Sequence, residues 1–524
     1  MKKCILLAVF GFILNSFPQV VNDNLGFNKK QIHTLEKVKS KHVENDLLVT
    51  LNKDISKKKK DFSANDFDLP GCNQVVVLSK SIREAIDKNT IKSVEVKENY
   101  KAIVKITIKQ DKFDLEDIKG KLLNIDGVES VSYNNVYESS SSSVADSSST
   151  VSYDWGINKI NGYSAKSLSY GSKKPIQIGV LDHGIDGVHT YLYDNLYHND
   201  YNQAHVDCSS GNGYTYLTTP TCTDSHGTHV AGVIGSKHNN TYNTEGVAKN
   251  VELISIKMFQ DNTQNLLSSS IIQAVSYATS INLPIINFSA TNPYYNQAEC
   301  DAFSQYSGLI VCSAGNELIN LDSDGTRSSY PTKYGLSNLI SVGASDDSDY
   351  YWLTESSSNS QGSSGVTNTN VIGSNYGQNS VHVFAPGDSI WSTIRNNGYG
   401  YMSGTSMAAP YVSGLAALCL SRNYTLTPVQ IKNYIVGNVD TVSILQNRCS
   451  SGGRINAYKT ISAIPVVHEH YYKDHYVKGV LSYKNMHKSY CDCGDFVYEY
   501  HVANSGGTTC IYCNASMSGG IIGG

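Results

Sequence analysis

Short apolar segments that recur between helix-like stretches restrict the fold of this chain more than any other feature. The segments IQIGVLDHG, VELISIKMF, LPIINFSA, GLIVCSAGN and NLISVGAS follow one another between residues 176 and 345. Helical stretches such as SSSIIQAVSYATS lie between them. Strands that alternate with helices predict a parallel sheet covered by helices on both faces. We therefore expect an α/β domain over residues 153–462.

Three polar residues stand where apolar strands of this sheet end. They are Asp182, Ser289 and Asn316. In open α/β sheets, ligands bind at the carboxyl ends of the strands. The sequence therefore places a candidate site at that edge.

A further hydroxyl, Ser406, opens the run SGTSMAAPYVSGLAALCL. The run has no polar face, which predicts a buried helix. Gly404 allows a sharp turn before it, and Pro410 fits a first helical turn. Ser406 would then lie at the positive end of the helix, facing charge that develops on a bound substrate. A serine that only caps the helix is the alternative.

A hydroxyl nucleophile needs a base, and a histidine base needs a partner that fixes its tautomer. His226 in SHGTHVAG suits the first role, and Asp182 in VLDHGID suits the second. Taken singly, the aspartate has a capping or turn role as its alternative, and the histidine a satisfied polar one.

Together the motifs VLDHGID, SHGTHVAG and SGTSMAAP resemble those of the subtilisin-like serine peptidases, in the same order. The resemblance covers about residues 153–462. It implies that Asp182 orients His226, that His226 is the general base and acid, and that Ser406 is the nucleophile. It further implies that Asn316, in SAGNE, donates to the oxyanion. Ser289, Ala290 and Gly315 would bind the substrate.

Two departures from the family pattern concern the site. His183 stands where the family has Ser or Thr, which puts a second titrating group beside Asp182. Ala290 and Thr291 replace a hydrophobic residue and a glycine, which predicts a narrower principal pocket. Glu317 at the rim would instead favour a basic substrate residue.

A third departure concerns calcium. Tyr191 takes the place of an aspartate that some relatives use for calcium, although the loop 238–246 still offers amide and carbonyl oxygens. Because calcium favours carboxylates, the sequence gives no basis for asserting calcium there.

The region before the α/β domain has its own pattern. Residues 45–138 contain strand-like LLVTLNK, YKAIVKITIK and VESVSYN and the helical LEDIKGKLLN, which predict a small α+β unit. The resemblance implies that this unit is a propeptide, a chaperone and inhibitor of its own enzyme. Residues 139–152 are a serine-rich linker, exposed and open to cleavage.

The two ends of the chain suggest export and a separate module. Residues 1–22 resemble a signal peptide, and no later segment is long and apolar enough to span a membrane. Export permits disulfides, and Cys208 with Cys222 is the pair we expect.

The tail, residues 467–524, forms a Cys/His-rich module. Cys491, Cys493, Cys510 and Cys513 would bind zinc, with His487 and His501 as spare ligands, or form two crossing disulfides.

These features predict a secreted serine endopeptidase made as a self-processed zymogen. We expect peptide or protein substrates, no cofactor for catalysis and a monomer. The net charge of −4 gives no reason to expect nucleic acid. The alternative is a catalytically silent scaffold that binds or adheres through its tail.

Overall fold

The computed structural model describes most of two folded units and a short hairpin near the C-terminus. The described residues are 41–52, 62, 66–67, 72–78, 101–108, 114–138, 151–168, 175–197, 205–261, 263–323, 328–357, 369–466, 486–490 and 496–500. The expected signal peptide, nearly all of the serine-rich linker and the four cysteines of the tail lie outside this set.

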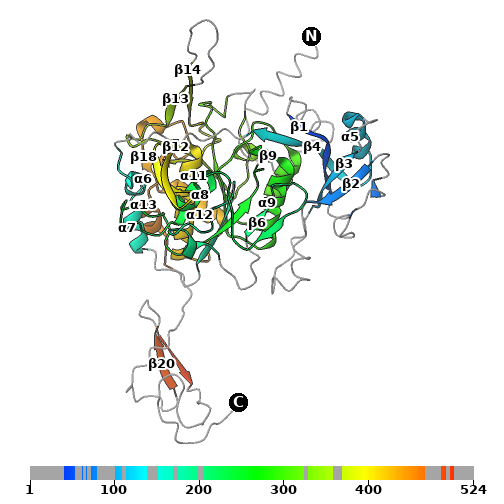
Figure 1. Ribbon diagram of the computed structural model, residues 1–524. Helices are drawn as coiled ribbons and strands as arrows, with labels where there is room; N and C mark the ends of the chain where they lie inside the picture. The colour runs from blue at the N-terminus through cyan, green and yellow to red at the C-terminus, as the bar shows by residue number, and fades with distance from the viewer. Residues whose placement is uncertain are drawn as a thin grey trace, which may run out of the picture.

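An α+β unit comes first, as the sequence predicts (Figure 1). Its antiparallel strands have the order β2–β3–β1–β4. They are β1 (His42–Leu51), β2 (Cys72–Val77), β3 (Ile103–Ile108) and β4 (Val128–Glu138). Helix α5 (Leu115–Leu123) begins at Asp114, whose side chain accepts from the Glu116 N–H. Ile118 and Leu122 on its inner face pack into the apolar core of this unit.

The second unit is built on a ten-stranded, mostly parallel sheet. Strand order is β18–β19–β15–β12–β11–β10–β5–β8–β6–β7, with antiparallel pairing only at the two ends. The predicted strands form its centre: β5 (Ile176–Asp182), β8 (Val251–Lys257), β10 (Ile285–Phe288), β11 (Leu309–Ser313) and β12 (Leu339–Ser345). The outer strands are β6 (His205–Asp207), β7 (Thr215–Leu217), β15 (Val383–Pro386), β18 (Asp440–Thr441) and β19 (Gly453–Arg454).

Helices cover both faces of this sheet, which confirms the predicted α/β architecture. Alternate residues of one strand enter different cores: Ile310 packs on one side, and Leu309 and Val311 on the other. One face carries α6 (Trp155–Lys159), α7 (Gly162–Leu168), α8 (His226–Gly235), α11 (Thr405–Arg422), α12 (Pro428–Gly437) and α13 (Ala457–Ala463). The opposite face carries α9 (Ser268–Ser280) and α10 (Gln297–Gln305).

Smaller elements complete the second unit. Two antiparallel hairpins are β13 (Leu353–Ser357) with β14 (Thr369–Gly373), and β16 (Ile390–Ile394) with β17 (Gly398–Met402). Three 3₁₀ turns are η2 (Tyr193–Asn195), η3 (Thr332–Tyr334) and η4 (Ser443–Leu445). None of the helices in the described part of the chain is long and apolar enough to cross a membrane.

The two units share one sheet edge. Strand β9 (Asn265–Leu267) pairs antiparallel with the last residues of β4, so that Val136 lies opposite Leu267 and Glu138 opposite Asn265. In Figure 1 the α+β unit lies beside α9. Strand β4 also packs against α10. The chain that leads into the linker is therefore held against the second unit.

The expected bond between Cys208 and Cys222 is not formed, because the two thiols face different surroundings. Cys208 is buried in the core around α9, whereas the Cys222 Sγ lies 3.5 Å from the Thr228 Oγ1 on α8. Both are free thiols, as are the other four cysteines of residues 205–466.

Of the C-terminal module, the structure describes only the pair β20 (Met486–Tyr490) and β21 (Phe496–Tyr500). The predicted zinc ligands lie beyond these residues, so that prediction stays open.

Candidate active site

The carboxyl ends of three adjacent strands bring the predicted strand-end residues to one edge. Asp182 is the last residue of β5, and Ser289 directly follows β10. The two strands run in parallel with Phe288 beside Leu181. Strand β11 continues the row and ends three residues before Asn316. The sequence prediction of a site at this edge agrees with the strand order.

Asp182 and His226 form a buried hydrogen-bonded pair. The His226 Nδ1 lies 2.8 Å from the Asp182 Oδ1 and 3.0 Å from its Oδ2. His226 is the first residue of α8, and its backbone N–H donates to the Asp224 carboxylate at 2.7 Å, just before the helix. This geometry fixes the histidine tautomer with the proton on Nδ1 and leaves Nε2 as the basic atom.

The two groups shift each other's pKa in opposite directions. Burial by itself raises the pKa of Asp182, but the charge of His226 and hydrogen bonds from His183 and His226 outweigh it, so the pKa lies below its usual range. Burial alone would lower the pKa of His226, yet the Asp182 carboxylate raises it above the ordinary value. The pair is therefore suited to hold a proton on the imidazole during a reaction.

The second histidine of SHGTHVAG has a structural role. The His229 Nε2 donates to the carbonyls of Ile390 and Gly400, at 2.8 and 3.2 Å. Burial lowers its pKa to about 3, so it stays neutral. Of the two histidines, only His226 contacts the aspartate.

Ser406 lies in the first turn of α11, a helix whose other residues up to Ser421 are all buried. The helix starts at Thr405, so Pro410 stands in its second turn. The prediction that Pro410 lies in the first turn is wrong. Because proline lacks an N–H, it leaves the Ser406 carbonyl without its helical donor. The Ser289 hydroxyl donates to that carbonyl instead, at 2.9 Å. Through this hydrogen bond, the first turn of α11, which carries Ser406, is held next to the end of β10.

The Ser406 hydroxyl donates to the Ser289 carbonyl oxygen at 3.1 Å. No hydrogen bond between Ser406 and His226 is formed in the described part of the chain. Helices α8 and α11 pack against each other (Figure 1). Ser406 and His226 each lie in the first turn of their helices. Catalytic hydrogen bonds are often made only when substrate is bound, so the arrangement is compatible with proton transfer after a rotation of the serine side chain.

The side chain of Asn316 is oriented by Thr405. Its Oδ1 accepts from the Thr405 N–H at 3.0 Å and from the Thr405 hydroxyl at 2.8 Å. The Thr405 hydroxyl in turn accepts from the Gly315 N–H at 3.1 Å. With Oδ1 occupied, the Nδ2 donor remains for a ligand beside the first turn of α11, where helix N–H groups lack partners inside the helix.

Asn375 holds the loop that carries Asn316, and sequence reasoning missed it. Its Nδ2 donates to the Ala314 carbonyl at 3.0 Å and to the Glu317 carboxylate at 2.6 Å. Its Oδ1 accepts from the Glu317 N–H at 3.1 Å. Gly315 has a φ of +101°, and a Cβ there would lie 2.4 Å from the Asn375 Nδ2. Thr405 was also missed, although it stands inside the quoted SGTS motif.

The proposed substrate strand is partly buried. Ala290 packs beside the core around α9, and its carbonyl accepts from the Ser313 hydroxyl at 3.4 Å. Glu317 is engaged by Asn375, and this position limits its freedom to meet a basic substrate residue.

Asp182, His183 and His226 form a compact group whose ligand-type atoms lie within 4.8 Å of one another. Their facing atoms are engaged in hydrogen bonds to each other. The group is therefore better described as a hydrogen-bonded set than as a metal centre.

Several oxygens of the loop 238–246, which the sequence analysis considered for calcium, have partners within the protein. The Asn239 Oδ1 accepts from the Thr241 N–H at 2.9 Å, and the Thr244 carbonyl accepts from the Asn239 N–H at 2.8 Å. Glu245 pairs with the buried Lys166 at 2.7 Å. The Tyr191 ring packs on Tyr399 with 5.8 Å between ring centroids. The Asn239 side-chain oxygen, the Thr244 carbonyl and the Glu245 carboxylate thus each have a partner within the protein.

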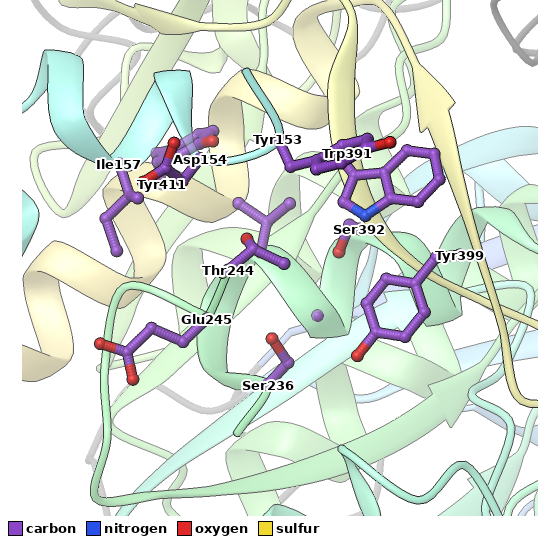
Figure 2. A pocket seen from close by; sticks show the side chains of 12 residues that line it. Tyr153, Asp154, Ile157, Ser236, Thr244, Glu245, Trp391, Ser392, Tyr399 and Tyr411 are labelled. Atoms are coloured by element: carbon purple, nitrogen blue, oxygen red, sulfur yellow. The ribbon is translucent and has the colours of Figure 1, made fainter. Parts of the chain in front are cut away.

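A pocket beside this loop lies away from Asp182 and Ser406. Figure 2 shows the rings of Trp391 and Tyr399 on one side and Glu245 and Ser236 on another. Gly232 and Val233 in its wall follow His226 by six and seven residues on α8, about 10 Å along the helix axis. Tyr153 packs on Trp391 with 4.7 Å between ring centroids, so the start of the second unit is anchored there.

A serine hydrolase site consists of an aspartate–histidine pair, a serine nucleophile and donors for the oxyanion. The Asp182–His226 pair, Ser406 at the start of α11 and the side-chain amide of Asn316 correspond to these parts. Residues 173–454 match the profile of the Subtilase family. Subtilisin DY of Bacillus licheniformis is 32% identical over 262 residues, which are 49% of this chain and 81% of that protein.

Two further similar proteins differ in how much of their own length this chain matches. Subtilisin-like protease 2 of Plasmodium falciparum is 32% identical over 280 residues, 52% of this chain but 19% of that longer protein. The crystal structure of a cold adapted subtilisin-like serine proteinase aligns at 24% identity with a TM-score of 0.42, covering 58% of this chain and 97% of that one. From the matched profile and the similarity to subtilisin DY, this chain belongs to the subtilase family of serine peptidases.

Proposed function

We propose that this chain is a secreted serine endopeptidase that is made as a precursor and cuts itself. The observation that carries the proposal is the Asp182–His226 pair, with α11 presenting Ser406 beside the end of β10. Membership of the subtilase family supports it. The sequence contains all four residues that the proposed reaction uses, which are Asp182, His226, Asn316 and Ser406.

The reaction would proceed through an acyl-enzyme. His226 takes the Ser406 proton while the Ser406 Oγ attacks the peptide carbonyl, and Asp182 stabilises the imidazolium that forms. The Asn316 Nδ2 and the Ser406 N–H donate to the oxyanion. His226 then protonates the leaving amine, and water releases the acid by the same steps in reverse. These groups supply the base, the nucleophile and the charge stabilisation, so no cofactor is needed.

The α+β unit would inhibit the enzyme by adding its last strand to the edge formed by β9. Support for this comes from a polar contact at the junction. The Tyr137 hydroxyl donates to the buried Glu299 carboxylate at 2.9 Å. On the other oxygen of Glu299, Asn292 donates at 2.9 Å and Tyr334 at 3.2 Å. Because the Tyr137 hydroxyl gives the buried Glu299 carboxylate a hydrogen-bond donor, this contact would stabilise the α+β unit in its docked position.

Cleavage after the docked strand would release the inhibitor, and we infer a cut between about Tyr137 and Tyr153. The pairing of β4 with β9 would deliver this segment to the edge of the second unit. We also infer export, on the basis of residues 1–22, and a principal pocket that accepts large aromatic residues poorly because of Ala290 and Thr291. A positional scanning peptide library with a strong Phe or Tyr preference would contradict the pocket proposal.

The direct test of the function is hydrolysis of an unfolded protein by the purified full chain. We expect activity in the wild type and a loss on the order of a million-fold in turnover in Ser406→Ala and His226→Ala. Circular dichroism would check that the variants fold. Equal activity in Ser406→Ala would contradict the proposal, and an inactive wild type would favour the binding scaffold.

Self-processing has its own test. Mass spectrometry of the wild type should give a catalytic unit that begins within the inferred range, and Ser406→Ala expressed alone should remain uncut. Adding a trace of active wild type tests cleavage in trans. A Ser406→Ala chain that is cut alone would show that another protease does the work.

A further inference from the structure

His183 is a buried side chain that lies directly against the Asp182–His226 pair. Its backbone N–H donates to the Asp182 Oδ1 at 2.8 Å, and its ring Nδ1 lies 3.1 Å from the same oxygen. Because an ionised carboxylate only accepts, the His183 Nδ1 carries the proton in this contact. The Asp182 Oδ1 therefore receives hydrogen bonds from two groups of His183 as well as from His226.

Phe259 fixes the plane of the His183 ring. The two rings are stacked with 3.7 Å between centroids and an angle of 9° between planes. On its other side, His183 meets the His226 ring edge-on, with 5.6 Å between centroids and an angle of 65°. The imidazole has little freedom to leave Asp182, since it is held by a stack, a hydrogen bond and burial.

We propose that His183 is a positioning residue for the peptidase reaction, holding the Asp182 carboxylate in the orientation that His226 needs through its ring N–H. The proposal rests on the proposed function, because it assumes that Asp182 and His226 act in catalysis. It assigns a role to a residue that replaces the usual Ser or Thr of this motif.

Several charged groups share this environment and have to be considered in a pH measurement. The Asp224 carboxylate accepts a hydrogen bond from the His226 backbone N–H. On the β8 side, Asp261 interacts electrostatically with His183, and the Lys257 Nζ pairs with Asp261 at 2.5 Å. Without the hydrogen bond from His183, the Asp182 carboxylate is less neutralised and attracts the His226 imidazolium more strongly. That change stabilises the imidazolium and moves the acid limb of activity to higher pH.

The experiment compares two substitutions of His183 in the full chain. His183→Phe keeps a flat ring to stack on Phe259 but lacks the donor. His183→Asn restores an amide N–H close to the place of Nδ1. His189→Phe is the matched control, because His189 is also a buried histidine and its Nε2 donates to the Gly398 carbonyl at 3.0 Å, away from Asp182.

We expect His183→Phe to lower kcat about tenfold with little change in KM, a small part of the ~10⁴-fold loss that follows when a triad aspartate becomes Asn. Its acid limb should move up by about half a pH unit. His183→Asn should recover most of both. His189→Phe should leave the acid limb in place. His183→Leu is a second donor-free variant if the Phe variant does not accumulate.

Two outcomes would overturn the inference. One is a donor-free variant with wild-type kcat and an unmoved acid limb, and the other is a His183→Asn variant no better than His183→Phe. A fluorophosphonate titration of the wild type separates this from the proposed function. An unlabelled wild type contradicts both, whereas a labelled wild type with an unaffected donor-free variant contradicts only the role of His183.

Discussion

At the residue scale, Asn316 divides its amide between two tasks. Its oxygen accepts from Thr405, and under the proposed function its nitrogen would donate to the substrate oxyanion. An oxyanion donor acts mainly in the transition state. We therefore predict that Asn316→Ala lowers kcat by about 10²–10³-fold, with a much smaller change in KM. Steady-state kinetics on one peptide substrate would measure both. A variant that changed KM alone would show that Asn316 only binds substrate.

A second prediction at this scale concerns pH. His226 must be neutral to act as a base, and the Asp182 carboxylate raises its pKa although burial opposes this. A raised pKa keeps the imidazole protonated to higher pH, so kcat/KM should fall as the pH drops through a value above the ordinary histidine range. Profiles of kcat/KM against pH would check this. An acid limb below about 6.5, the unperturbed histidine pKa, would contradict the assigned pairing.

At the scale of elements, the turn into α11 depends on Gly404. This residue has a φ of +142°, where side chains are strained, and a Cβ there would lie 3.2 Å from the Asn316 Nδ2. We predict that Gly404→Ala costs about 1–3 kcal/mol of unfolding free energy and also lowers kcat.

The matched control for that substitution is Gly437→Ala. Gly437 is the last residue of α12 and has no neighbouring atom within 4 Å of an added Cβ. Thermal unfolding and kinetics of both variants would be compared. If Gly404→Ala proved as stable and active as Gly437→Ala, the turn would not depend on glycine.

The helices and strands also differ in how far they could be predicted from the sequence. The strands of the sheet centre were predictable because each is a short apolar run that ends in a polar residue, as in IQIGVLD, or is directly followed by one, as in IINF before Ser289. The buried α11 was predictable from its lack of a polar face. The clamp by Asn375 was not, because it joins residues 58 apart in sequence and asparagine gives no periodic signal. The expected Cys208–Cys222 pair was wrong, since proximity in a loop does not fix where two thiols point.

At the scale of the whole molecule, the contact between the two units contains carboxyl groups that should respond to pH. Burial raises the pKa of Asp301 to about 6, although Lys101 at 3.7 Å opposes this. Burial also raises the pKa of Glu299. Removing the α+β unit would expose this surface and return both values toward normal. These carboxyl groups therefore take up protons when the two units associate. The affinity of the α+β unit for the second unit should increase as the pH falls below the raised pKa values, and this gain is lost as the pH rises through them.

We predict that the cleaved α+β unit inhibits the processed enzyme about three- to fivefold more tightly at pH 5.5 than at pH 7.5, for one proton with a pKa of about 6. Inhibition constants at both pH values would measure this. Asp301→Asn should flatten the dependence. Tighter inhibition at the higher pH would mean that the carboxyl groups do not govern release.

The proposed function requires that Ser406 is a nucleophile activated by His226 and Asp182. Its most direct test is labelling of the processed wild type with a fluorophosphonate, followed by mass spectrometry of the labelled peptide. We expect one adduct per catalytic unit, on Ser406, and a labelling rate that falls to background in His226→Ala. An adduct on another residue, or labelling that is unchanged in His226→Ala, would contradict it.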